Sequence, residues 1–123
     1  MPKVMVVDDS LFMRQMLMKI LMAQGFEICS EASTAQDAVE KYKQFKPDLV
    51  TMDIVMPMME ELDGIGAVKE ILKFDPNARI LVVSAMGQQS LVVEAIRSGA
   101  RDFIVKPLQP ARLIEAVKNI LKP

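Results

Sequence analysis

The sequence of 123 residues contains no histidine and no tryptophan, and Cys29 is its single cysteine. Histidine-based catalysis and histidine metal ligation are therefore excluded. One cysteine excludes an internal disulfide and a cysteine-based metal site. A reducing compartment is the simple interpretation, and we expect a cytoplasmic protein.

Strong net charge and long apolar runs are also lacking. The net charge is −1, which gives no electrostatic case for binding nucleic acid or an anionic membrane. No apolar run approaches the ~18 residues of a membrane span, and the first residues do not resemble a signal peptide. About half of the residues are apolar and a quarter charged. We therefore expect one folded unit over residues 1–123, with no output domain, that acts as a monomer.

Apolar runs typical of strands alternate along the chain with patterns typical of amphipathic helices. This alternation predicts an α/β fold, a doubly wound five-stranded parallel sheet with helices on both faces, for which we expect strand order 2-1-3-4-5. Ser10 and Thr34 are predicted helix caps. The helix after Thr34 is expected to bury Ala35, Ala38, Val39, Tyr42 and Phe45.

The stretch from Leu49 to Pro57 is a buried-strand pattern that carries one carboxylate, Asp53, near its end. A buried charge is costly unless something compensates for it. Taken alone, Asp53 could be a turn or cap residue that follows the strand.

Polar side chains follow the other predicted strands in the same way. In a doubly wound sheet, ligands bind at the carboxyl ends of the strands, where the strand order reverses. Each residue by itself has a structural alternative: a helix cap for the acidic pair, a turn for the serine, a solvated lysine. Their joint placement, each at the end of its own strand, is what those alternatives do not predict. The residues are Asp8, Asp9, Asp53, Ser84 and Lys106.

Three carboxylates brought together repel one another, by roughly 3 kcal/mol per pair at ~5 Å and an effective dielectric of ~20. A divalent cation removes this cost, and oxygen ligands alone favour Mg²⁺. A lysine and a hydroxyl could then hold phosphoryl oxygens, while a carboxylate attacks phosphorus. A carboxylate in such a site, with Mg²⁺ bound, can form an aspartyl phosphate.

Four motifs resemble those of two-component response-regulator receiver domains, and the resemblance spans essentially the whole chain. The stretch from Asp8 to Arg14 is similar to chemotaxis receivers, of the CheY type or the receiver part of CheB. With no methylesterase domain expected, the stand-alone CheY type is the better match. The motifs are Val6-Val7-Asp8-Asp9-Ser10, Met52-Asp53-Ile54-Val55-Met56-Pro57, Val83-Ser84-Ala85 and Asp102-Phe103-Ile104-Val105-Lys106-Pro107.

The resemblance implies a role for each matching residue. Asp53 matches the phosphoacceptor, and Lys106, which pairs with the phosphoryl group, is expected to precede a cis proline. Ser84 matches the switch residue and Phe103 the aromatic switch that turns inward when Ser84 moves. The implied Mg²⁺ site consists of Asp8, Asp9, Asp53 and the backbone carbonyl of Val55, with Asp9 as a direct ligand and Asp8 acting through water.

The loop after Met59 is longer than the family pattern, because Glu60, Glu61 and Leu62 precede Asp63-Gly64. The extension is similar to that of archaeal members. It is either a neutral insertion or an acidic contact for a lineage-specific partner.

The resemblance implies a regulator rather than an enzyme with its own substrate. A histidine kinase of the CheA type would phosphorylate Asp53, and the phosphorylated form would bind a flagellar switch protein or an archaellar adaptor. A phosphorelay carrier has the same site and stays an alternative. A metabolite phosphatase would need a carboxylate where Val55 stands. Because the side chains of Val55 and Met86 cannot orient water, we expect slow self-dephosphorylation and therefore help from a phosphatase or a phosphate sink.

Overall fold

The computed structural model describes residues 2–54 and 63–122. Its centre is one parallel sheet of five strands in the order β2-β1-β3-β4-β5, which confirms the predicted fold and strand order. The strands are β1 (Lys3–Val7), β2 (Glu27–Ala32), β3 (Leu49–Met52), β4 (Ile80–Ser84) and β5 (Asp102–Val105).

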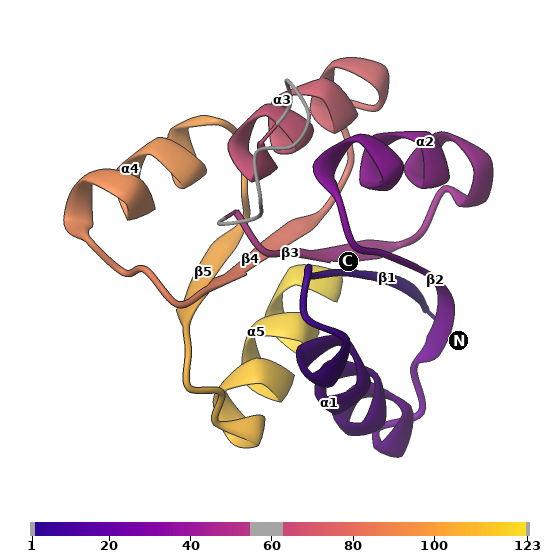
Figure 1. Cartoon of the computed structure of the whole chain (residues 1–123). Coiled ribbons are helices and arrows are strands. Elements are labelled where there is room, and N and C mark those ends of the chain that lie inside the picture. The colour runs from indigo at the N-terminus through magenta and orange to yellow at the C-terminus, as the bar shows by residue number, and fades with distance from the viewer. Residues whose placement is uncertain (1, 55–62, 123) are drawn as a thin grey trace.

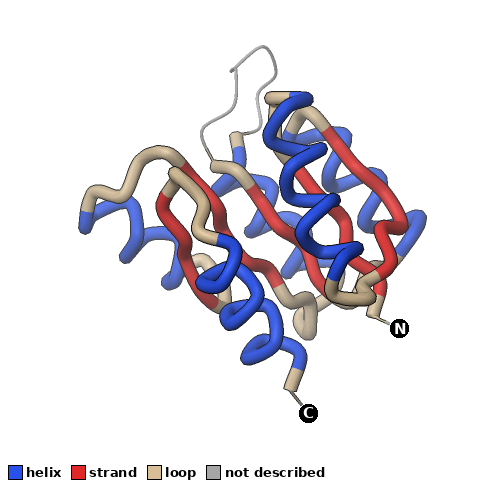
Figure 2. The backbone as a smooth tube through the Cα atoms, turned by 90° about the horizontal axis from the view of Figure 1, so that it is seen from below, coloured by secondary structure: helices blue, strands red, loops and turns tan. Residues whose placement is uncertain are grey.

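Helices cover both faces of the sheet. In Figure 1, α2, α3 and α4 lie above the strands, and α1 and α5 lie below them. Figure 2, seen from below, brings the two helices of the lower layer in front of the strands. None of the helices in the described ranges is long and apolar enough to cross a membrane. The helices are α1 (Leu11–Ala23), α2 (Ala35–Phe45), α3 (Gly64–Phe74), α4 (Gln89–Arg97) and α5 (Pro110–Leu121).

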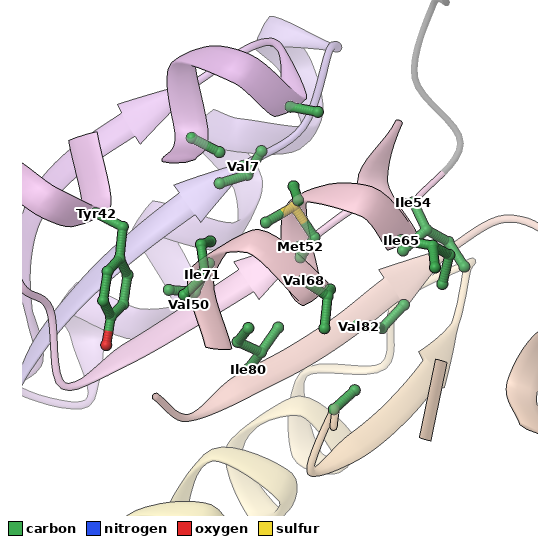
Figure 3. Packing of buried hydrophobic residues seen from close by; sticks show 14 of the residues in the cluster. Val7, Tyr42, Val50, Met52, Ile54, Ile65, Val68, Ile71, Ile80 and Val82 are labelled. Atoms are coloured by element: carbon green, nitrogen blue, oxygen red, sulfur yellow. The ribbon is translucent and has the colours of Figure 1, made fainter. Parts of the chain in front are cut away.

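Each central strand is apolar on both sides because each side faces a helical layer. Along β1, Val4 and Val6 belong to the core between the sheet and helices α1 and α5. Met5 and Val7 belong to the core between the sheet and helices α2, α3 and α4. The strand side chains alternate because successive residues of a strand point to opposite faces. Figure 3 shows the second core closely, with Met52 of β3 among the residues packed beneath α3.

The predicted caps are confirmed. The side-chain oxygens of Ser10 and Thr34 accept hydrogen bonds from the amides of Met13 and Asp37 at the starts of α1 and α2.

The burial of Phe45 was predicted wrongly, since its side chain is 41% exposed. Phe45 is the last residue of α2, and the stripe that packs on the sheet ends one turn earlier, at the buried Tyr42.

Candidate functional site

The register of the strands brings the candidate residues to one edge of the sheet. Val7 pairs with Met52, so the residues that follow them, Asp8 and Asp53, lie side by side. The amide of Asp53 donates to the carbonyl of Val7 at 3.0 Å, which extends the ladder by one bond. Parallel pairing therefore joins carboxylates that are far apart in sequence.

The pairing of β4 with β5 places Ser84 and Lys106 next to each other in the same way. On the far side of β4, Ser84 pairs with Val105, and the amide of Lys106 donates to the carbonyl of Ser84 at 2.8 Å. Ser84 is the last residue of β4, and Lys106 is the first residue after β5. The predicted cis peptide between Lys106 and Pro107 is present.

Three carboxylates form the acidic part of the site. Asp8, Asp9 and Asp53 each present one oxygen, and these oxygens lie within 4.8 Å of one another. Asp8 and Asp53 are 1% and 4% exposed, whereas Asp9 is open to solvent. This donor set, of oxygen alone and partly accessible to water, fits a hard divalent cation such as Mg²⁺. The fourth predicted ligand, the carbonyl of Val55, lies outside the described residues, as does the extension from Glu60 to Leu62.

Lys106 supplies the positive charge. Its Nζ lies 2.7 Å from Oδ2 of Asp8 and 3.4 Å from Oδ2 of Asp53. Burial lowers the pKa of the Lys106 ammonium, but the hydrogen bond to Asp8 and the charges of Asp53 and Asp8 outweigh it, so the net pKa is raised. Lys106 is therefore a charged group held against both buried carboxylates.

Ser84 and Phe103 occupy the positions that the sequence predicted for them. Ser84 is fully buried, and its Oγ accepts a hydrogen bond from the amide of Met86 at 3.2 Å. Phe103 is 9% exposed and pairs in register with Val82 of β4. The aromatic ring is therefore already inward in this structure, and its movement stays a prediction.

Sequence reasoning gave no site role to two residues that shape this edge. A Cβ on Gly64 would lie 2.6 Å from the carbonyl oxygen of Asp53, so only glycine allows α3 to begin so close to that peptide. Arg14 donates from Nη1 to the carbonyl oxygen of Asp8 at 2.7 Å. An Asp-Gly pair at a helix start was a signal for Gly64, whereas the contact of Arg14 depends on folding.

Residues 4–118 match the family model of the response regulator receiver domain. The chain belongs to this family. It is 57% identical over 120 residues to the chemotaxis protein CheY of Thermotoga maritima, and the match covers 98% of each chain. It is 55% identical over 119 residues to CheY of Bacillus subtilis, with 97% of each chain covered.

Among solved structures, the chain is similar to the crystal structure of a CheX–CheY–BeF₃–Mg²⁺ complex from Borrelia burgdorferi. The TM-score is 0.92 at 40% identity, and the match covers 98% of this chain and 90% of that chain. These likenesses confirm the prediction of a CheY-type receiver of a chemotaxis two-component system. Receivers of this type are regulators rather than classical enzymes, as the motifs implied.

Proposed function

We propose that this chain is a stand-alone response regulator that accepts a phosphoryl group on Asp53 from a histidine kinase of the CheA type. The observation that carries the proposal is the meeting of a buried Asp53 with two further carboxylates and a lysine at one sheet edge. Neither a helix cap nor a turn requires such a set. The chain itself has no histidine, so the phosphohistidine is the partner's.

The transfer is a displacement at phosphorus. A carboxylate oxygen of Asp53 attacks, the new O–P bond forms, and the P–N bond to the partner's imidazole breaks with its electron pair left on the ring nitrogen. Asp8, Asp9, Asp53 and the carbonyl of Val55 would hold Mg²⁺, which offsets negative charge on the phosphoryl oxygens when bound. Nζ of Lys106 lies 3.4 Å from Oδ2 of Asp53, close enough to form an ion pair with a phosphoryl oxygen on that residue.

Phosphorylation would act as a switch because it adds acceptors that the unmodified site lacks. Ser84 uses its Oγ only as an acceptor among the described residues, so its hydroxyl hydrogen is available to a phosphoryl oxygen. Ser84 and Lys106 would gain bonds to the phosphoryl group only in the phosphorylated state. These added bonds would shift the conformational population toward the active form. We propose that Phe103, one strand pairing away, reports this shift at the surface around β5.

The partners follow from the family. The phosphorylated form is proposed to bind a motility-apparatus protein, either a flagellar switch protein or an archaellar adaptor. The related Borrelia structure holds CheY together with CheX, BeF₃ and Mg²⁺. This supports Mg²⁺ as the cofactor and a second chemotaxis protein, such as a phosphatase, as a partner of this chain.

Labelling with a small phosphodonor tests the proposal. Acetyl phosphate, or a phosphorylated CheA-type kinase, should label the wild-type protein in Mg²⁺ and not in EDTA. Asp53→Asn should abolish the label, and Asp48→Asn, at the opposite end of β3, should retain it. Failure of both donors to label folded wild-type protein, or unchanged labelling of Asp53→Asn, would sink the proposal.

The phosphorylated protein is expected to lose its phosphate slowly. Met86, which is 41% exposed beside Ser84, has no group that orients an attacking water, and Val55 has none either. Met86→Glu supplies a carboxylate and should shorten the half-life of the label. A half-life of a few seconds for the wild-type protein, followed by release of inorganic phosphate, would contradict the prediction.

A further inference from the structure

Arg14 links the site to β2, the outermost strand on one side of the sheet. It lies in the first turn of α1, and its side chain is 14% exposed. Nη1 donates to the carbonyl oxygen of Asp8 at 2.7 Å, and Nε donates to Oε1 of Glu31 on β2 at 2.8 Å. The planar guanidinium therefore ties the connection between β1 and α1 to the neighbouring strand. The phosphoryl transfer proposed above gives this bridge no role.

The carbonyl that Arg14 holds belongs to the peptide unit between Asp8 and Asp9. That unit is planar, so fixing its oxygen fixes the orientation of the Asp9 amide and Cα. The side chain of Asp8 is held by the amide of Ser10 and by Lys106. In contrast, the exposed side chain of Asp9 has no hydrogen bond or ion pair within residues 2–54 and 63–122, so only the placement of its backbone limits the region that its carboxylate can reach.

We propose that Arg14 is a positioning residue for the divalent cation: it holds the Asp8–Asp9 peptide against Glu31 of β2 and thereby places the carboxylate of Asp9 for the metal. The inference rests on the proposed function, because it assigns a role to a residue around the same cation site. It concerns the affinity of the unphosphorylated protein for Mg²⁺, and it can be measured without any phosphodonor.

Electrostatics and geometry predict opposite signs for the loss of Arg14. A guanidinium near the carboxylates repels a second cation, so by charge alone its removal should tighten Mg²⁺ binding. If its function is to place Asp9, removal should weaken binding instead. Substitutions of groups that orient metal ligands commonly cost about 10-fold to 100-fold in affinity. The direction of the change therefore separates the two effects.

The experiment is calorimetric titration of unphosphorylated protein with MgCl₂. Arg14→Met keeps much of the apolar stem and should raise the Kd by about tenfold. The double variant Arg14→Met/Glu31→Gln restores the net charge and should show the same loss, because Glu31 acts through Arg14. Arg112→Met is the matched control. It removes the exposed Arg112–Asp102 ion pair and should leave the Kd unchanged.

Two further readouts separate positioning from loss of structure. A thermal melt of each variant in EDTA measures whether the fold is kept. An NMR spectrum of the backbone amides is also recorded, and the Asp9 amide resonance is expected to move in Arg14→Met and not in Arg112→Met. If Arg14→Met fails to fold, Arg14→Lys replaces it. The single amine of lysine cannot contact both Glu31 and the Asp8 carbonyl as the guanidinium does, so the affinity of Arg14→Lys for Mg²⁺ should still fall.

Unchanged or tighter Mg²⁺ binding by folded Arg14→Met overturns the inference, as does an equal loss in Arg112→Met. A wild-type protein that binds no Mg²⁺ would overturn the metal site of the proposed function and this inference with it. Binding by the wild type with no effect of Arg14→Met removes the role of Arg14 alone.

Discussion

Polar side chains that are buried divide into those at the sheet edge and one in the core. Asp8, Asp53 and Ser84 end or follow strands, and each accepts a hydrogen bond: the two carboxylates from Lys106, and Ser84 from the amide of Met86. Thr51, 1% exposed in β3, is the exception: its hydroxyl has no hydrogen-bond partner in the part of the chain that the structure describes. Each buried polar side chain at the functional edge has at least one hydrogen-bond partner, whereas this core hydroxyl has none among the described residues and carries a desolvation cost.

Thr51→Val is expected to stabilise the protein by about 1 kcal/mol, because valine has a similar shape and no unsatisfied hydroxyl. Urea denaturation in EDTA measures the change. Thr34→Val is the control, since the Thr34 hydroxyl caps α2 and its loss should cost about 1 kcal/mol. A destabilised Thr51→Val variant would show that the hydroxyl has a partner that this structure does not reveal.

Tyr42 provides the pH-dependent prediction. Its buried hydroxyl donates to Oδ2 of Asp75 at 2.8 Å, and burial, followed by the bond to Asp75 and its charge, raises the pKa of Tyr42 well above its usual value. The folded state therefore favours the neutral phenol. This contribution is present below the unfolded pKa of about 10 and is lost as the pH rises beyond it.

Tyr42→Phe should therefore cost about 1 kcal/mol of unfolding free energy at neutral pH, the value of a typical hydrogen bond. The difference from the wild type should stay constant up to about pH 9 and shrink above about pH 10. Denaturant unfolding at several pH values checks it. A difference that grows above pH 10 would contradict the assignment.

At the scale of elements, the five helices are anchored unequally. α2 buries four residues and has a capping side chain, Thr34. α5 lacks a capping side chain but buries Leu113, Ala116, Val117 and Ile120. α4 has neither advantage. It spans nine residues, buries only Ala95, and begins after Gln88, whose side chain makes no cap bond. Weak anchoring suits a helix beside the proposed switch residue Ser84.

We expect the amides of α4 to exchange with solvent fastest among the five helices, since local opening follows from few buried contacts and an uncapped end. Native-state hydrogen exchange followed by NMR measures this. Gln88→Asp offers a capping carboxylate and should slow exchange in α4 while α2 stays unchanged. Slower exchange in wild-type α4 than in α2 would refute the ranking.

At the scale of the whole molecule, the carboxylates of Asp8, Asp9 and Asp53 meet because two distant segments, the ends of β1 and β3, lie side by side. Their mutual repulsion opposes folding when no cation is bound, although Lys106 offsets part of it. A cation that binds only the folded state reverses the balance. The stability of the protein should therefore depend on Mg²⁺ through this one edge.

Asp9→Asn is expected to be more stable than the wild type in EDTA and less stable in saturating Mg²⁺. The substitution relieves repulsion but removes a proposed ligand. At 100 times the Kd, Mg²⁺ should stabilise the wild type by about 2.7 kcal/mol. Thermal melts in both conditions check the crossover, with Asp48→Asn as a control. Equal Mg²⁺ stabilisation of Asp9→Asn and the wild type would exclude Asp9 as a ligand.

The sequence by itself determined the order of elements and the identity of the candidate groups. Apolar runs and helical patterns, punctuated by caps such as Ser10 and Thr34, are local properties, and they located the strands and helices to within a few residues. The motifs around Asp53 and Lys106 indicated both the fold and the chemistry, because each lies at the end of its own apolar strand.

Only the tertiary structure decided which groups touch. The hydrogen bonds of Lys106 to Asp8 and Asp53, the bridge from Arg14 to Glu31, and the close approach of Gly64 to Asp53 join segments that are distant in sequence. The exposure of Phe45 likewise depends on where the packed layers end. The lack of a partner for the Thr51 hydroxyl among residues 2–54 and 63–122 depends on which side chains lie opposite it. Periodicity gives the face of an element, but contact distances arise only when registers and layers are fixed together.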